Sequence, residues 1–243
     1  MSNYTISIAG DCAINLEFSK IISPETSTMI RMAALNLRED PIKGIMEIVP
    51  TFCSLMVVYN PVEIGYDSLC VALEGKLAGL SVQGAIQKKV THIPVCYGGS
   101  FGPDLENVAQ LAGVSTNEVI SIHSSKDYLI DMLGFLPGFA YLGGLDPRIH
   151  VPRLEIPRTL ISAGSVGIGG AQTGIYPLDS PGGWQIIGRS PLRPYNPDSE
   201  TPILYSAGEY LRFEPVTSEE YRAIEAQLAA GKYDVNVTIG EVE

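Results

Sequence analysis

Apolar residues in the first third of the chain switch between a period of two and a period near four. The alternating stretches predict strands and the four-residue periods predict helices. Ser23 followed by Pro24 is typical of a helix N-cap with proline at the first helical position. The predicted elements are strands over 4–9, 12–18, 45–49 and 54–59, and helices from 24 to a stop at Pro41 and from 66 to a stop at Gly79.

Beyond about residue 85 the pattern changes to one strand, two short helices and then a long region of β structure and loops. Residues 90–97 predict a strand, and Pro94 within them predicts an edge strand, because proline has no N–H for a neighbouring strand. The remaining predictions are helices over 103–112 with Gly113 as C-cap and from Ser115 onward, β structure and loops over 128–213, and a final helix from Thr217 to Gly231.

These elements predict two domains. Residues 1–85 are expected to form a small α+β sandwich, with helices on one face of an antiparallel sheet. Residues 86–243 are expected to form a β-rich domain with a C-terminal helix. The boundary has no long linker, so we expect the two domains to pack closely.

The segment 134–191 is unusual in composition. It holds 12 of the 25 glycines and 7 of the 17 prolines, yet branched aliphatic and aromatic side chains recur throughout it. Disordered Gly/Pro-rich segments lack such side chains. A folded region rich in loops is therefore predicted, and loops held on a rigid scaffold often carry function.

Composition limits which binding partners and which cellular compartment are expected for the protein. The formal net charge is 16 − 27 = −11, which argues against nucleic acid or an anionic membrane as partner. The chain starts without a secretory signal pattern, and no apolar run approaches the length of a membrane helix. The four scattered cysteines indicate reduced thiols and a cytoplasmic location.

Three common kinds of site are not supported. The three histidines lie far from one another, and the histidines and cysteines show no zinc-type ligand spacing, so no metal site is predicted. No phosphate-binding loop is present, because the glycine-rich run 167–172 ends in Gln172 and no helical pattern follows. Ser165 in AGSVG resembles a nucleophile elbow, but the segment after it is not helical, so a hydroxyl in a turn is favoured.

Single polar and aromatic residues remain as candidates. His123 is expected to be a half-buried, hydrogen-bonded imidazole, and Trp184 to be a core anchor whose flanking glycines leave one ring edge reachable. Arg158 and Arg189 lie in charge-poor surroundings, where an arginine must find a carboxylate, a carbonyl or a ligand anion. For each, a structural role is favoured and a binding role stays open, because an unpaired buried charge is costly.

Eight short segments, taken together and in order, resemble one family. They are GDCA at 10–13, IMEIVP at 45–50, IPVCYGG at 93–99, FGPDL at 101–105, GFLPGF at 134–139, QTGIYP at 172–177, SPGGW at 180–184 and IGR at 187–189. The chain resembles the PxpB family, the B-type subunits of bacterial 5-oxoprolinase, over nearly its whole length. That family includes the sporulation-kinase inhibitor KipI and is related to allophanate hydrolase subunit 1 and to a region of urea carboxylase.

The resemblance implies a fold and a function. The fold is an α+β N-terminal domain followed by a cyclophilin-like β-barrel domain. The function is that of a non-autonomous subunit of an ATP-dependent 5-oxoprolinase, which hydrolyses 5-oxo-L-proline (pyroglutamate) to L-glutamate. The implied partners are a PxpC/KipA-type subunit and a PxpA (LamB/YcsF-type) subunit. ATP with Mg would act at the level of the complex, because this chain shows neither a phosphate loop nor a carboxylate cluster.

Within that family the Gly/Pro-rich loops are expected to form a groove, closed by the companion subunit, that holds or passes the substrate. The candidate lining residues are His123, Arg158, Gln172, Thr173, Tyr176 and Trp184. Arg158 is expected to neutralise the substrate carboxylate, while Gln172 and Tyr176 hydrogen-bond the lactam. No catalytic residue is assigned.

Two other functions stay open. The KipI branch implies an inhibitor of a sporulation-type sensor histidine kinase, a binding module that presents an apolar patch to a helix bundle. The motifs do not separate this branch from the enzyme subunit. A prolyl isomerase is suggested by the barrel alone, but a fold does not carry function, and the family that the chain resembles does not match the cyclophilin catalytic pattern.

Overall fold

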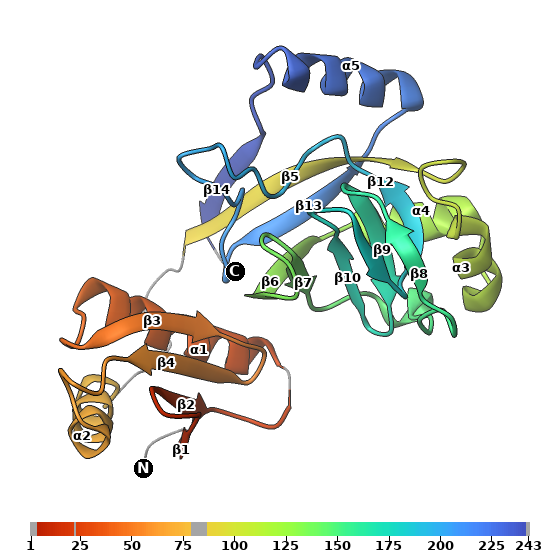
Figure 1. Ribbon diagram of the computed structural model, residues 1–243. Coiled ribbons are helices and arrows are strands. Elements are labelled where there is room, and N and C mark those ends of the chain that lie inside the picture. The colour runs from red at the N-terminus through yellow and green to blue at the C-terminus, as the bar shows by residue number, and fades with distance from the viewer. Residues whose placement is uncertain (1–3, 22, 79–86, 242–243) are drawn as a thin grey trace. The chain divides into compact units, whose positions relative to one another are not determined.

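The computed structural model describes residues 4–21, 23–78 and 87–241. They divide into two compact units, residues 1–85 and residues 86–243 (Figure 1). Gly79, the predicted stop of the second helix, lies outside the described residues. The close packing of the two domains stays a prediction.

The first unit is a four-stranded antiparallel sheet with two helices, in the strand order β1-β2-β4-β3. Its elements are β1 (Thr5–Ile8), β2 (Ala13–Glu17), α1 (Pro24–Glu39), β3 (Ile45–Pro50), β4 (Ser54–Tyr59) and α2 (Tyr66–Lys76). The Ser23 side chain accepts a hydrogen bond from the Thr26 N–H, which caps α1 as predicted. The strands and helices expected from the hydrophobic period are confirmed.

One face of this sheet is buried under both helices. Alternate residues of the central strands, such as Leu16 and Val57, are fully buried against Leu37 of α1 and Leu73 of α2. The apolar side chains that recur every second residue in the strands therefore pack against those that recur about every fourth residue in the helices. This arrangement confirms the predicted α+β architecture with its helices on one face.

The second unit is built mainly from short strands. Its elements are β5 (Gln87–Tyr97), α3 (Leu105–Ala112), α4 (Thr116–Ser124), β6 (Asp127–Leu133), β7 (Ala140–Leu142), the 3-10 turn η1 (Pro147–Ile149), β8 (Arg158–Ile161), β9 (Ser165–Gly169), β10 (Gln172–Ile175), β11 (Ser180–Gly182), β12 (Gln185–Arg189), β13 (Tyr210–Pro215), α5 (Ser218–Ala229) and β14 (Val237–Glu241). A long region of short strands and loops over 128–213 is confirmed.

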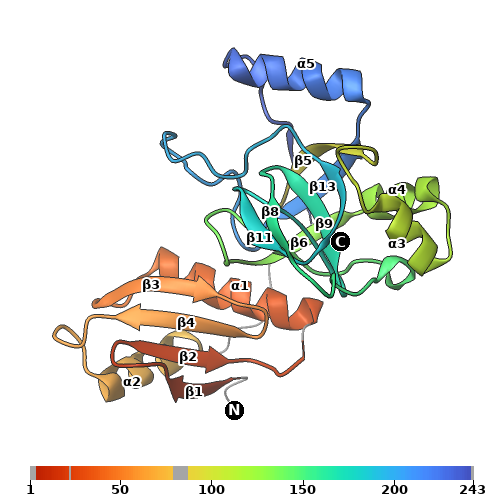
Figure 2. The ribbon, with the colours of Figure 1, turned by 45° about the vertical axis from the view of Figure 1, so that its right-hand side comes forward.

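Seven of the described strands close into a barrel in the order β12-β9-β10-β7-β6-β13-β5, because β12 also pairs with β5. β14 continues the sheet beyond β5 (Figure 1), and β8 with β11 forms a separate two-stranded ribbon (Figure 2). β5 and β13 run parallel. The closed barrel after an α+β unit confirms the predicted fold class, an α+β domain followed by a cyclophilin-like β-barrel.

The prediction that Pro94 marks an edge strand is wrong. β5 is an interior strand, paired with β13 along one side and with β14 and then β12 along the other. The N–H of His92 points to the second side and bonds to the Asn236 carbonyl. Pro94, two residues on, has the same direction, and it lies where the β14 pairing has ended at Thr91 and the β12 pairing begins at Cys96. The missing N–H therefore faces a gap between two partners.

The helices of the second unit follow their end signals. Gly113 is left-handed with φ +70° at the end of α3, and Thr217 and Glu220 form a complete capping box at the start of α5. α3 packs on β12, α4 on β13 and α5 on β5. β14 was not among the predicted elements. None of the helices in the described ranges is long and apolar enough to cross a membrane.

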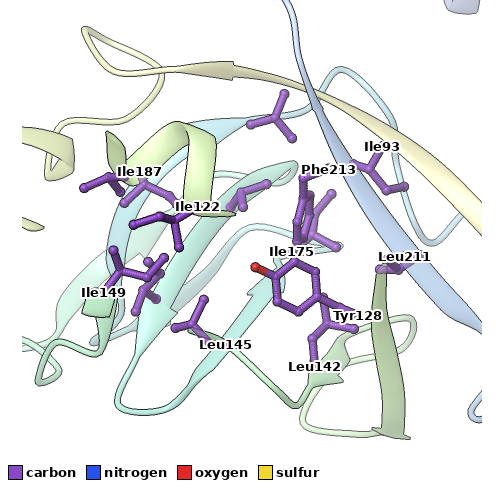
Figure 3. Close-up of a cluster of buried hydrophobic side chains, with 14 of the residues drawn as sticks. Ile93, Ile122, Tyr128, Leu142, Leu145, Ile149, Ile175, Ile187, Leu211 and Phe213 are labelled. Atoms are coloured by element: carbon purple, nitrogen blue, oxygen red, sulfur yellow. The ribbon is translucent and has the colours of Figure 1, made fainter. Parts of the chain in front are cut away.

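The barrel interior is a continuous apolar core. Figure 3 shows the rings of Tyr128 and Phe213 in this core, beside Ile175 of the opposite wall. Ile93 and Leu211 fill it from β5 and β13. Because these side chains of the barrel strands face the core, the residues that alternate with them face outward.

Candidate functional site

The six candidate residues divide between the two faces of the barrel wall. Successive side chains of a strand point to opposite faces. On β10, Thr173 and Ile175 belong to the inner face, since Ile175 lies in the barrel core. Gln172 and Tyr176 therefore belong to the outer face. His123 joins Thr173 inside, whereas Arg158 and Trp184 lie outside with Tyr176.

The inner residues form a closed hydrogen-bond chain. His123 on α4 is fully buried, with Nδ1 2.7 Å from the Tyr97 hydroxyl and Nε2 2.7 Å from Thr173 Oγ1. The Thr173 hydroxyl donates to the Gly167 carbonyl at 3.0 Å. Because that hydroxyl has one proton, it accepts from Nε2–H, so Nδ1 accepts from the Tyr97 O–H. We call Tyr97, His123 and Thr173 the inner network, and each polar side-chain atom of these three residues has a hydrogen-bond partner.

The electrostatics of the inner network keep His123 neutral. Burial lowers the pKa of His123 to about 3, and burial raises the pKa of Tyr97 well above its usual range. The imidazole stacks on Phe213 with ring centroids 4.5 Å apart. Neither His123 nor Thr173 reaches the surface. Their arrangement links α4 to β5 and β10 across the barrel.

The outer residues surround a small aromatic cluster. This outer cluster consists of Phe139, Ile161, Tyr176, Trp184 and Ile186, with Leu136 and Tyr141 packed against it. Trp184 is 4% exposed and lies directly against the backbone of β9 and β10. A Cβ at Gly169 would overlap the indole ring, and one at Gly174 would crowd it. The glycines of this segment therefore make room for the tryptophan outside the barrel.

The charges of two arginines act on the Tyr176 hydroxyl. Burial is the main cause that raises the pKa of Tyr176 to about 12, and the charges of Arg153 and Arg158 oppose it. The phenol is therefore neutral and a hydrogen-bond donor at physiological pH. The hydroxyl also lies close to Gly182, where a side chain would collide with it.

Arg158 is engaged with a carboxylate. Its Nη2 donates to Asp104 Oδ1 at 2.7 Å, and its Nη1 lies 3.5 Å from the Trp184 carbonyl. The other oxygen of Asp104 accepts from the Ile186 N–H at 2.6 Å. This arrangement joins the FGPDL segment, β8 and β12. Arg158 thus lies beside the outer cluster, but its Nη2 group is already paired with Asp104.

Gln172 has unused hydrogen-bonding capacity. It is half-buried at the start of β10, and it lies opposite Gly169, the residue that the indole ring covers. Among the described residues its side-chain amide has no hydrogen-bond partner. The amide therefore offers both a donor and an acceptor at the margin of the outer cluster.

Two further residues of this face were not among the candidates. Phe135 is 60% exposed, packs edge-on against Phe139 at 5.5 Å and has φ +66°, a strained value for a residue with a side chain. Arg153 lies over the Trp184 ring, 5.8 Å from its centroid. Arg153 lies in the same charge-poor segment as Arg158, so the sequence feature that made Arg158 a candidate could also have identified Arg153.

Metal ligands do not gather in the described part of the chain: no group of three or more His, Cys, Asp or Glu side chains there has a metal-binding arrangement. The outer face instead offers a neutral phenol, a free amide, aromatic edges and two guanidinium groups. Such a set suits a small polar ligand with an anionic group.

The comparisons with known proteins agree with one another. The family model of the carboxyltransferase domain, subdomain C and D, matches residues 4–205. The B-type subunit of 5-oxoprolinase from Bacillus subtilis (strain 168) is 40% identical over 230 residues, which cover 90% of this chain and 96% of that protein. The corresponding 5-oxoprolinase subunit of Escherichia coli O157:H7 is 39% identical over 86% of this chain and 94% of that protein.

A solved structure supports the fold. The crystal structure of the Kluyveromyces lactis urea carboxylase matches 98% of this chain and 24% of that chain with a TM-score of 0.80 at 21% identity, which speaks for the fold alone. This protein has the fold of a carboxyltransferase domain made of subdomains C and D. Within that class the chain belongs to the PxpB family of 5-oxoprolinase subunits, as its sequence motifs predicted.

Proposed function

We propose that this chain is a non-autonomous subunit of an ATP-dependent 5-oxoprolinase complex that hydrolyses 5-oxo-L-proline to L-glutamate. The observation that carries the proposal is the near-complete match to two proteins named as the B-type subunit of 5-oxoprolinase, which the chain covers over 96% and 94% of their lengths. The companions are a PxpC/KipA-type subunit and a PxpA (LamB/YcsF-type) subunit in the cytoplasm.

The outer face supports a substrate-holding role for this subunit. 5-Oxoproline carries a lactam, which both donates and accepts a hydrogen bond, and a carboxylate. The free amide of Gln172 and the hydroxyl of Tyr176 suit the lactam, and a guanidinium group suits the carboxylate. The loops around the outer cluster hold the substrate or its activated intermediate, and a companion subunit closes over them.

Catalysis is completed elsewhere in the complex. Lactam opening driven by ATP requires a phosphoryl donor with its metal ion. The sequence has no phosphate loop, so ATP with Mg is held with the help of the companion subunits. The isolated chain is accordingly expected to be inactive.

The test is reconstitution from the three subunits, with glutamate release from 5-oxo-L-proline measured with and without ATP. Activity should require all three, and omission of this chain should abolish it. Full activity of the two companions without this chain would overturn the proposal, as would rapid turnover by this chain alone. Alanine substitutions of Gln172 and Tyr176 then test the outer face, and undiminished rates in both would remove it from the substrate site.

A further inference from the structure

The segment that carries Arg153 is fixed on both sides of that residue. The Val151 carbonyl accepts from the Gly170 N–H at 2.8 Å, at the turn between β9 and β10. The Leu154 N–H donates to the Gly183 carbonyl at 2.7 Å, one residue before Trp184. The Arg153 backbone is therefore held against the barrel, although its side chain is exposed. A fixed backbone with an accessible side chain is a preorganised arrangement for binding.

The guanidinium group of Arg153 is not used by another part of the described chain except for its contact with Trp184. It lies 5.8 Å from the ring centroid, and no described carboxylate lies within ion-pair distance of it. Arg148, Arg158 and Arg212 differ, since each pairs with an aspartate. A guanidinium over an aromatic ring keeps its in-plane N–H groups available to a ligand.

Arg153 also acts on the same hydroxyl that marks the candidate site. Its positive charge, with that of Arg158, lowers the pKa of Tyr176 against the larger effect of burial. The geometry agrees, since Arg153 lies over the Trp184 ring and Tyr176 packs against the same ring with centroids 6.3 Å apart. This location separates Arg153 from arginines that merely lie on the surface.

We propose that Arg153, rather than the Asp104-bound Arg158, receives the carboxylate of a small lactam acid at the outer cluster. The inference rests on the proposed function, which supplies the substrate class. The planar fork of arginine matches the two oxygens of a carboxylate. Arg158 holds Asp104 in place and so keeps β8 and β12 together beside the ligand. Arg153 is a specificity residue for the acid group.

Trp184 makes the proposal directly measurable, because it is the single tryptophan of the chain and the guanidinium lies over its ring. Tryptophan fluorescence of the purified full chain is titrated with 5-oxo-L-proline and with 2-pyrrolidinone, which has the lactam and no carboxylate. The acid should give a saturable change, and 2-pyrrolidinone should bind at least roughly tenfold more weakly.

The variants are Arg153→Ala and Arg153→Lys, with Arg222→Ala as the matched control, an exposed arginine on α5. Arg153→Ala should weaken binding of 5-oxo-L-proline by roughly 10- to 100-fold, because it removes a charge-assisted hydrogen bond. Arg153→Lys should restore part of this affinity. The control should bind as the wild type does. Equal affinity of Arg153→Ala and the wild type overturns the inference.

The reconstituted complex gives an independent readout. In it Arg153→Ala should raise KM for 5-oxo-L-proline by a similar factor while kcat changes little, because a carboxylate remote from the lactam carbon contributes binding. An unchanged KM for 5-oxo-L-proline overturns the inference and leaves the proposed function intact. This measurement decides the question even if the isolated chain gives no fluorescence response. Arg153-dependent binding in a complex that releases no glutamate would instead contradict the proposed function alone.

Discussion

Gln172 and Thr173 are neighbours on β10, yet they lie in opposite surroundings. The Thr173 hydroxyl belongs to the inner network, where it accepts from His123 and donates to the Gly167 carbonyl. The Gln172 amide faces outward beside the outer cluster and has no partner in the described residues. Two adjacent residues therefore differ in that the Thr173 hydroxyl has its hydrogen bonds within the protein and the Gln172 amide has none in the described part of the chain.

This difference indicates which polar residues are available for function. A buried polar group that lacks a partner lowers stability, so a core histidine persists only with its hydrogen bonds complete. His123 meets that condition on both ring nitrogens. A group without a protein partner at a surface instead contributes little to folding, and it bonds to water until a ligand or another subunit takes the place of the water. The comparison therefore separates structural from functional candidates by their unused hydrogen bonds.

The largest effect is expected for His123→Leu. The change leaves the buried hydroxyls of Tyr97 and Thr173 each without one partner, and the free energy of unfolding should fall by about 3 kcal/mol. Urea denaturation measures this. The matched control is His150→Leu, since His150 is exposed and its Nε2–H donates a single hydrogen bond to the Leu145 carbonyl. Equal losses in the two variants would contradict a special role for the inner network.

Thr173→Val removes the hydroxyl from the inner face with almost no change in shape. The His123 Nε2–H and the Gly167 carbonyl then lose their shared partner, and stability should fall by about 2 kcal/mol. The barrel should keep its secondary structure by circular dichroism, because the valine methyl fills the same space. A variant as stable as the wild type would show that water replaces the hydroxyl.

The inner network also predicts a dependence of stability on pH. Burial lowers the pKa of His123 to about 3, whereas the unfolded imidazole has a pKa near 6.5. Below pH 6.5 the unfolded chain takes up a proton that the folded chain refuses. Stability should therefore fall from pH 6.5 toward pH 3, by at most about 1.4 kcal/mol per pH unit from this residue, and should not change above pH 7 on its account.

Denaturation of the wild type and of His123→Gln at pH 6.5 and pH 5.5 isolates this contribution. Carboxylates titrate alike in both proteins, so the difference between the two pH dependences belongs to the histidine. The wild type should lose more stability than the variant on acidification. Identical dependences would mean that His123 accepts a proton without leaving its buried position.

Local patterns in the sequence were sufficient for the parts of the fold that depend on neighbouring residues. The N-cap at Ser23, the C-cap at Gly113 and the helix start at Thr217 all depend on a few neighbouring residues, and each was predicted. The interior position of β5 was not, because Pro94 is tolerated through the gap between β14 and β12. β14 was missed although Val235, Val237 and Ile239 alternate.

The site was less accessible to sequence reasoning, because its partners are distant along the chain. His123 and Thr173 are 50 residues apart, and Asp104 and Arg158 are 54 residues apart. The motifs identified the segments that carry these side chains. The segments alone do not say which face of the barrel a side chain occupies, since a strand presents both. Only the closed barrel assigns Thr173 to the inside and Gln172 to the outside.

The smallest effect on stability, and the sharpest test of the comparison, is expected for Gln172→Ala. The side chain has no described hydrogen-bond partner to lose, so the free energy of unfolding should change by less than about 0.5 kcal/mol. In the reconstituted complex the same variant should lower kcat/KM for 5-oxo-L-proline by roughly tenfold, the value of one hydrogen bond to the lactam. A stable variant with wild-type kinetics would show that spare hydrogen-bonding capacity on this face does not mark the substrate site, and a destabilised one would show that Gln172 is as structural as Thr173.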